Sequence, residues 1–202
     1  MSQIDTLIIG AGAAGLSCAL VLGSGLEKEF ALGKSVTLIA HQKTSHLQNA
    51  LFNNVLGLKP GTLGKDILDE GLIQLKNLYP KVSIIEKEKV NAVVKSEEVY
   101  IVTTNKAEYK ATNVVIAVGY TSLITIKGLE NYIEPHPRAA IEKDRIWLRN
   151  TNHIVDENLF VAGTLAGWRS QYAIACGSGA QVATDILTVW NNGKDAKIHD
   201  KV

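Results

Sequence analysis

The stretch "TLIIGAGAAGLSCAL", residues 6–20, decides the fold of this chain. Its glycines at positions 10, 12 and 15 follow directly on a short apolar run. That run, residues 6–9, predicts a buried parallel strand, and the alanine- and leucine-rich residues 13–22 predict a helix. The glycines fall at the junction between the two, with the spacing of a dinucleotide-binding turn.

Each glycine of this turn has a physical role. Gly10 permits the tight turn, Gly12 lets the backbone approach a pyrophosphate, and Gly15 lets the helix pack closely on the strand. The phosphates would meet free N–H groups at the helix start, at Ala13 and Ala14. Small residues also serve plain helix packing, and that alternative stays open. The strand before the turn, the helix after it and its N-terminal position favour a dinucleotide.

The bulk properties are those of a globular protein. The chain has 202 residues, enough for one domain of generous size or two small ones, with 46% apolar and 20% charged residues. A net charge of +1 with dispersed cations predicts neither nucleic acid nor an anionic membrane as a partner. Cys18 and Cys176 lie far apart, without a Cys-x-x-Cys or a Cys/His cluster, so we expect no disulfide framework and no metal site.

No targeting segment is expected. The chain runs directly into its first strand without a basic leader, and no stretch approaches 18 consecutive apolar residues. We therefore expect a soluble, cytoplasmic protein.

The next part of the chain alternates strand, loop and helix. Residues 35–40 predict a second buried strand, and the polar residues 41–61 predict a long loop of the kind that often carries function. Thr62 is expected to cap a helix that ends before Pro80.

The remainder alternates short β-rich runs with turns. The runs 81–86, 90–96, 98–104 and 108–112 predict a strand followed by a small antiparallel meander. Residues 120–144 predict a surface connection and residues 191–202 a polar, frayed tail. The further elements expected are strands 113–119, 145–149 and 158–163 and a closing helix 171–190.

Four stretches together resemble the flavoprotein family of thioredoxin reductases and related pyridine nucleotide-disulfide oxidoreductases. They are "IIGAGAAG", "NNVLG" followed by a helix, "VVIAVG" and "LFVAGTLAGWRSQYAIACGSGAQVA", of which the last is the most specific. The resemblance implies an α/β fold: a Rossmann-like FAD-binding domain whose parallel sheet is flanked by helices and carries a small antiparallel β-meander. Residues 1–202 would form that single domain, with core segments 1–119 and 158–190.

The last stretch favours FAD over NAD as the cofactor. FAD extends beyond the pyrophosphate, and a second strand and helix that return to the cofactor are needed only to bind that extension. In the resembled family, the strand ending in Gly163 leads to the ribityl chain, and the helix beginning near Gln171 points its N-terminus at the flavin. The N–H groups of Tyr172 and Ala173 would stabilise the negative charge of the reduced ring. A buried helix with glycines for close packing is the alternative.

Three departures from the family are informative. The family inserts an NADPH domain between the strands that correspond to 113–119 and 158–163. Here only about 40 residues, 120–157, lie between these strands, which is too few for a domain of ordinary size. Because the Cys-x-x-Cys pair is also missing, NADPH-driven disulfide reduction is not expected. Thr164 replaces the family aspartate that binds ribityl hydroxyls, which lowers the expected affinity. Ala40 and His41 stand where many such folds place a ribose-binding acid; His41 either substitutes for it or is an exposed loop histidine.

Further candidates come from the resemblance, each with an ordinary alternative. Asn54 matches an asparagine near the flavin, or forms an Asx turn. His46 or Leu47 falls where the family has a glutamine near the ring. Val90 and the segment from Ala117 to Gly119 match backbone positions near the adenine and pyrophosphate, although core strands explain their character equally well.

Other residues have no assigned role. Cys176 is either a redox thiol or a small buried apolar group, and Cys18 is expected in the core. Trp168 and Arg169 would cover the flavin or dock a substrate. Residues 134–138, "EPHPR", predict an exposed turn whose histidine and arginine suit an anion or a partner.

We therefore expect a minimal FAD-dependent oxidoreductase, with the electron donor and acceptor supplied from outside by a small molecule or a protein redox partner. A homodimer is possible, because family members are commonly dimers. The alternative is a non-catalytic FAD- or nucleotide-binding or interaction module, which the changes at Thr164 and Ala40 favour. An NAD-dependent dehydrogenase is disfavoured because no substrate domain is expected.

Overall fold

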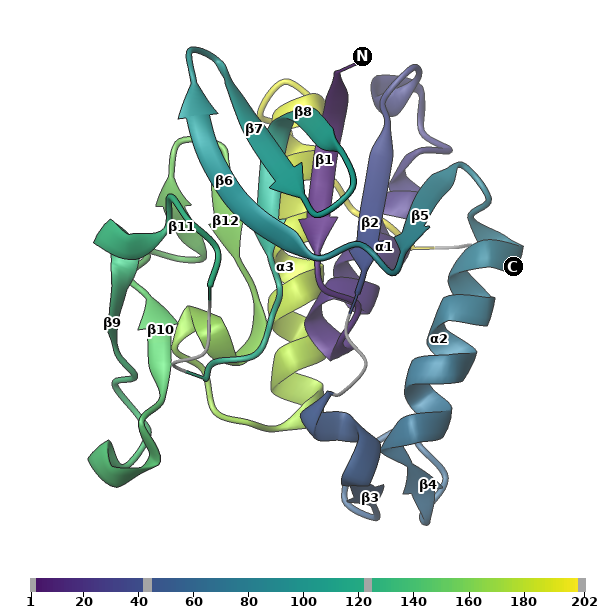
Figure 1. Ribbon diagram of the computed structural model, residues 1–202. Coiled ribbons are helices and arrows are strands. Elements are labelled where there is room, and N and C mark those ends of the chain that lie inside the picture. The colour runs from purple at the N-terminus through teal and green to yellow at the C-terminus, as the bar shows by residue number, and fades with distance from the viewer. Residues whose placement is uncertain (1–2, 42–44, 122–124, 200–202) are drawn as a thin grey trace.

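The computed structural model describes residues 3–41, 45–121 and 125–199, and its centre is an eight-stranded sheet (Figure 1). The strands of this sheet are β1 (Ile4–Ile9), β2 (Val36–Ala40), β5 (Val82–Glu86), β6 (Val90–Ser96), β7 (Val99–Thr104), β8 (Glu108–Ile116), β11 (Ile154–Asp156) and β12 (Leu159–Val161). Their order along the main path is β11-β12-β8-β1-β2-β5, and the β6–β7 hairpin joins the sheet at β8.

The middle of the sheet is parallel. β1 pairs with β2 on one side and β8 on the other, β2 pairs with β5, and β12 pairs with β8, all in parallel. These strands are continuous apolar runs because both of their faces are covered. The structure thus confirms the predicted Rossmann-like α/β fold with its small antiparallel meander.

β8 differs from the expectation of two separate strands. It is one strand of nine residues, antiparallel to β7 in its first half and parallel to β1 throughout its second half. Ala111 pairs with a residue on each side. The polar residues 108–112 suggested a separate hairpin strand because only the second half is buried on both faces. Strand structure ends at Ile116, before the glycine at 119.

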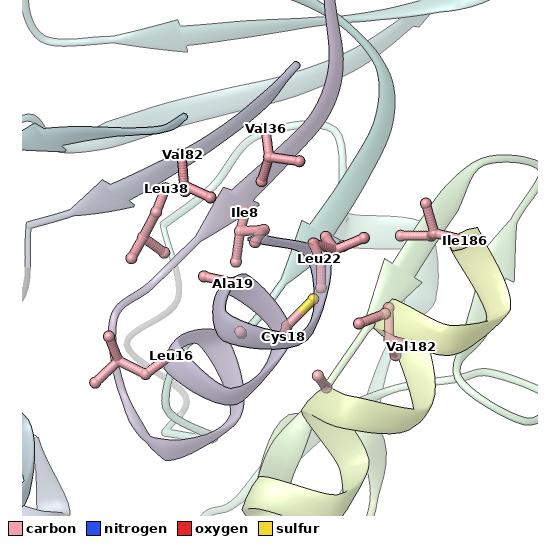
Figure 2. Close-up of a cluster of buried hydrophobic side chains, with 14 of the residues drawn as sticks. Ile8, Leu16, Cys18, Ala19, Leu22, Val36, Leu38, Val82, Val182 and Ile186 are labelled. Carbon is pink, nitrogen blue, oxygen red and sulfur yellow. The ribbon is translucent and has the colours of Figure 1, made fainter. Parts of the chain in front are cut away.

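Two helices pack side by side on one face of the sheet (Figure 1). They are α1 (Ala13–Gly25), which continues three residues beyond the expected end, and α3 (Tyr172–Trp190). Side chains such as Cys18, Leu22 and Ile186 meet the sheet in one buried cluster (Figure 2). Burial raises the pKa of the Cys18 thiol, so this cysteine stays protonated as the expected core residue.

The opposite face is covered by the meander and by a second hairpin. That hairpin pairs β9 (Ile133–Pro135) with β10 (Ile146–Leu148), the latter inside the expected strand 145–149. Residues 120–144 are therefore not a plain surface connection, because β9 lies within them and Leu129 is fully buried in the core of this face. The sequence did not predict β9, because residues 120–144 contain prolines and have poor apolar periodicity.

The loop after β2 contains short regular pieces. The described part holds the 3-10 turn η2 (His46–Asn49) and the two-stranded pair of β3 (Leu51–Phe52) with β4 (Thr62–Leu63). Residues 42–44 of the expected loop lie outside the described residues.

The helix that follows is α2 (Gly64–Leu78), which ends before Pro80 as expected. The expected cap at Thr62 is wrong. Leu63 is the N-cap residue, no side chain caps the helix, and the Thr62 hydroxyl donates to the carbonyl of Lys59 at 2.6 Å. The hydroxyl serves the turn before β4, because pairing with β3 holds Thr62 in extended structure.

The segment after α3 is more ordered than a frayed tail as far as it is described. Ala196 is buried in the helical cluster, with Ile198 packed against it. Over residues 3–41, 45–121 and 125–199, no helix combines the length and the hydropathy that crossing a membrane requires.

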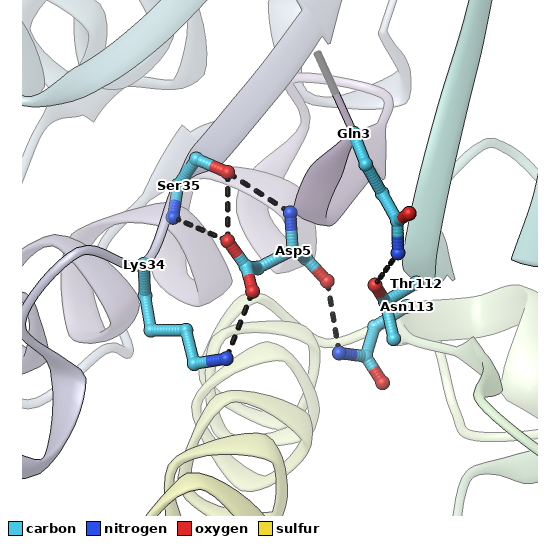
Figure 3. Close-up of polar contacts among 6 residues, drawn as sticks. All are labelled: Gln3, Asp5, Lys34, Ser35, Thr112 and Asn113. Carbon is cyan, nitrogen blue, oxygen red and sulfur yellow. Dashed lines mark hydrogen bonds and ion pairs between the residues drawn. The ribbon is translucent and has the colours of Figure 1, made fainter.

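A polar network ties the starts of β1 and β2 to the middle of β8 (Figure 3). The Asp5 carboxylate accepts hydrogen bonds from the backbone N–H and hydroxyl of Ser35, both at 2.9 Å, and pairs with Lys34 at 2.9 Å. Asn113 donates to the Asp5 carbonyl, and Gln3 donates to Thr112. The network fixes the register of β1 against β2 and β8 at the end of the sheet away from the glycine turn.

Candidate cofactor-binding site

A cavity of about 600 Å³ lies where the carboxyl ends of β1, β8 and β12 meet the starts of α1 and α3. This edge of an open parallel sheet is where such folds bind ligands. Most of the predicted site residues line the cavity: Gly12, Ala13, Ala14, His46, Ala117, Gly119, Gly163, Thr164, Gln171 and Tyr172. Segments from the two ends of the chain therefore share one wall.

The first turn has the geometry that its spacing predicts. Gly10 adopts a φ of +108°, which L side chains rarely reach, and a Cβ there would collide with the Ala117 carbonyl. A Cβ at Gly15 would collide with the Gly10 carbonyl. At Gly12 the nearest heavy atom to such a Cβ is the Ser45 hydroxyl oxygen, 4.0 Å away, so this position opens into the cavity.

Both helices present uncapped starts to the cavity. Gly12 is the N-cap residue of α1 and Gln171 that of α3, and neither receives a side-chain capping bond. The first main-chain bonds of the helices are donated by Leu16 to Gly12 and by Ala175 to Gln171. The N–H groups before these donors have no carbonyl within their helix, which makes both helix starts suitable for anionic groups.

The cavity wall is neutral. None of the described residues that form it is Asp, Glu, Lys or Arg. Negative charge inside it must therefore be balanced by N–H groups and by the positive ends of the two helices. Among the described ranges, no three His, Cys, Asp or Glu side chains gather closely enough to hold a metal ion.

A second cavity of about 210 Å³ adjoins the first along Val118, Gly119 and Thr121, which line both. Its wall includes three further predicted residues, Gly10, His41 and Val90. Two compartments joined at the carboxyl end of β8 suit an elongated ligand such as a dinucleotide.

Three predicted residues lie on neither wall, and the first, Gly15, is buried. Asn54 and Ala173 are both exposed. It is Asn53, not Asn54, whose side chain accepts a hydrogen bond from the Gly61 N–H, at 2.8 Å.

An aromatic pair forms one side of the first cavity. The rings of Phe52 and Tyr172 lie 5.2 Å apart, joining the pair of β3 and β4 to the start of α3. Burial raises the pKa of Tyr172 to about 12, and a hydrogen bond with the Cys176 thiol adds to the shift. Tyr172 is therefore a neutral group at any physiological pH.

The β9–β10 hairpin is anchored to the cavity wall through His136, so the expectation of an exposed "EPHPR" turn is wrong for this residue. His136 is only 7% exposed. Its Nδ1 accepts from the Arg138 N–H and its Nε2 donates to the Thr164 carbonyl, both at 3.1 Å. Arg138 also donates to the Gly167 carbonyl. Backbone acceptors and donors, invisible in sequence, account for this burial.

Residues 4–169 match the sequence profile of the family described as pyridine nucleotide-disulphide oxidoreductase. The match covers most of the chain.

The chain belongs to the pyridine nucleotide-disulphide oxidoreductase family.

Among curated proteins, a ferredoxin–NADP reductase of Streptococcus mutans is 24% identical over 205 residues, covering 98% of this chain and 51% of the relative. A ferredoxin–NADP reductase of Streptococcus thermophilus is 29% identical over 121 residues, covering 57% of this chain and 34% of the relative. The chain thus spans about half the length of the first of these curated relatives.

Solved structures share the fold at low identity. An oxidoreductase from Agrobacterium tumefaciens aligns with a TM-score of 0.77 at 14% identity, covering 96% of this chain and all of that one. A ferredoxin-flavin thioredoxin reductase from Clostridium acetobutylicum aligns with a TM-score of 0.69 at 18% identity, covering 95% and 99%. The predicted resemblance to this oxidoreductase family is confirmed.

Several wall residues escaped the sequence analysis. They are Ser45, Asn49, Ala50, Phe52, Thr121, Ala162, Ser170 and Ala175. The one local signal was Ser45, whose hydroxyl accepts from the Leu47 N–H at 3.2 Å and caps η2. Asn49 lies in η2, which packs against α2, whereas Ala162 follows β12 and Ala175 lies in α3.

Proposed function

We propose that this chain is a FAD-dependent oxidoreductase of minimal size, with an external electron donor and acceptor. The observation that carries the proposal is the shared cavity: the first turn and the start of α3, some 160 residues apart, line one space. When bound, FAD supplies reversible two-electron transfer. A cavity of about 600 Å³ with a smaller neighbour falls in the size range of cofactor sites.

The residues of the chain fit this group. The open position at Gly12 and the N–H groups of Ala13 and Ala14 would hold the pyrophosphate, because no side chain fills that space. The α3 start at Gln171 and Tyr172 would hold the polar edge of the flavin and stabilise negative charge there. The second cavity, with Val90 on its wall, would take the adenine.

The chain's part in the reaction is to bind, orient and polarise. Tyr172 stays protonated at neutral pH, so it acts as a neutral wall and not as a base. Thr164 offers a hydroxyl where the family has an aspartate, and its carbonyl is held by His136. The printed names of the relatives suggest NADPH and ferredoxin as candidate donors or acceptors.

The test is an anaerobic titration of the purified, FAD-saturated protein. We expect a yellow protein whose flavin absorption bleaches with NADPH, NADH or reduced ferredoxin, with dithionite as the positive control for reduction. Bleaching by dithionite alone leaves a partner-driven redox protein or a non-catalytic FAD carrier. A protein that binds no FAD contradicts the proposal and supports the second candidate, a non-catalytic nucleotide-binding or interaction module.

Thr164 separates the two candidates further. In a working flavin site, Thr164→Asp restores a charged acceptor for the ribityl hydroxyls and should tighten FAD binding about tenfold. Thr164→Val, which removes the hydroxyl at equal size, should weaken it. Equal dissociation constants for all three proteins, measured by flavin fluorescence, would show that Thr164 makes no contact with the cofactor.

A further inference from the structure

A third cavity, of about 570 Å³, lies on the neighbouring face of α3 and shares no lining residue with the two cavities of the cofactor site. Its wall includes His153, Trp168, Ile174, Gly177 and Asp185. Trp168 therefore lines this space and not the proposed flavin cavity. Nothing in the proposed oxidoreductase function uses these side chains.

The backbone at His153 is unusual. Thr151 and Ile154 exchange two hydrogen bonds at 2.9 Å, which makes Asn152 and His153 the central residues of a two-residue hairpin turn. Both adopt positive φ, +48° and +73°. Such turns favour Asn followed by Gly, because a side chain at the second position is disfavoured in this conformation. His153 occupies the second position, so the turn carries an imidazole ring where glycine is preferred.

The hydrogen bonds of His153 define which ring nitrogen is available. The side chain is 6% exposed, and Nδ1 lies 2.9 Å from the Val161 carbonyl oxygen. A carbonyl only accepts, so Nδ1 carries the hydrogen and Nε2 of the neutral ring is an acceptor. No donor among the described residues reaches Nε2, which leaves that edge of the ring to the cavity.

The rest of the wall is aromatic, apolar and acidic. Trp168 is 41% exposed, and the Arg138 guanidinium lies 5.2 Å from its ring centroid. Ile174 is 38% exposed beside it. Asp185 carries the one formal charge on the described wall and accepts from Gln181 at 2.8 Å.

We propose that this cavity is a binding site for a small aromatic molecule, neutral or cationic, that donates an N–H or O–H hydrogen bond to Nε2 of His153. Trp168 and Ile174 provide the apolar wall for its ring. Asp185 accepts a second hydrogen bond and disfavours anions. The site stands independently of the proposed flavin function.

Four matched probes test this chemistry on the full chain as purified. Phenol and benzamidine are aromatic donors, neutral and cationic; toluene has no donor, and benzoate is an anion without one. Binding is followed through the indole N–H resonance of Trp168, assigned with Trp168→Phe. We expect phenol and benzamidine to bind at least about tenfold more tightly than toluene and benzoate. Equal binding of all four, or none by phenol and benzamidine, would overturn the proposal.

Two variants keep the fold and remove the site. His153→Gly gives the turn its preferred residue and removes the acceptor, so phenol and benzamidine should lose about tenfold in affinity. A Cβ at Gly177 meets no atom within 4 Å, so Gly177→Leu should fill the cavity and abolish binding while Gly177→Ala, its control, leaves it open. Unchanged binding in His153→Gly or Gly177→Leu would contradict the assignment.

Discussion

At the scale of single residues, the glycines of the first turn are under opposite constraints. Gly10 and Gly15 are surrounded by backbone, whereas Gly12 faces open space in the cavity. The pattern of three glycines therefore combines two requirements of the fold with one requirement of the ligand. A substitution at Gly12 tests the requirement of the ligand without disturbing the two requirements of the fold.

Gly12→Asp should keep the fold and lose the cofactor. Aspartate is a good N-cap residue and adds favourable charge at the start of α1, so Tm should be unchanged or higher. Its carboxylate would occupy the place proposed for the pyrophosphate and repel it, weakening FAD binding at least about a hundredfold. Fluorescence titration measures the affinity. Gly12→Asn is the neutral control, and retention of wild-type FAD affinity in Gly12→Asp would refute the phosphate assignment.

Asp5 carries a pH-dependent part of the stability. Burial raises its pKa, but the hydrogen bonds from Lys34 and Ser35 outweigh that effect, so the net shift is downward. A depressed carboxyl pKa contributes stability that is present above the unfolded value, about 4, and is lost as pH falls through the folded value. Asp5→Asn should cost about 1–2 kcal/mol of unfolding free energy at pH 7.

That loss should shrink as pH falls below about 4 and through the lower folded pKa, where the wild-type carboxylate becomes protonated as well. Urea unfolding at a series of pH values measures it, with the exposed Asp195→Asn as the control. A deficit that is the same at pH 3 and pH 7 would mean that the carboxylate charge plays no part in joining the strand ends.

At the scale of elements, α1 and α3 pack closely against each other. A Cβ at Gly179 would collide with the Ala14 carbonyl, while one at Gly177 meets nothing. Because both helix starts line the same cavity, the contact at Gly179 also sets the distance between the two N–H clusters. The packing of α1 against α3 therefore also sets the geometry of the proposed cofactor site.

Gly179→Ala should therefore both destabilise the protein and weaken FAD binding. The gain in helix propensity is about 0.5–1 kcal/mol, whereas overpacking against backbone costs about 1–3 kcal/mol. Gly177→Ala receives the same propensity gain without the collision and should raise Tm. Thermal unfolding and FAD titration of both variants decide the matter; equal Tm values would show that the helices separate without cost.

At the scale of the whole molecule, we propose that the described ranges form a single domain. Two buried clusters lie on opposite faces of one sheet, and β8 contributes Val115 to one and Val114 and Ile116 to the other. The β9–β10 hairpin lies within residues 120–157, and Leu148 of this hairpin belongs to the second cluster. The hairpin is therefore part of the core.

A single domain should unfold in one cooperative transition. Calorimetry should give a van't Hoff enthalpy equal to the calorimetric one, at about 0.7 kcal/mol per residue near 60 °C. Adding FAD should raise Tm in one step by mass action. Two resolved transitions, one of them insensitive to FAD, would indicate that the hairpin region folds apart from the cofactor site.

The sequence by itself determined the sheet, the glycine turn and most of the wall. Strands 6–9 and 158–163 are apolar because both of their faces are covered. Glycine is required at Gly10 by the carbonyl of Ala117 after β8, and at Gly15 by the carbonyl of Gly10. These features leave patterns because each depends on the periodicity of one element or on one short turn.

Only the tertiary structure decided the burial of His136, the second cavity, the placing of Phe52 against Tyr172 and the strained turn at His153. Each depends on atoms brought together from distant segments, often backbone carbonyls that every residue carries alike. A carbonyl at Thr164 or Val161 looks the same in any sequence. These carbonyl acceptors come within hydrogen-bond distance of the histidines only in the folded chain.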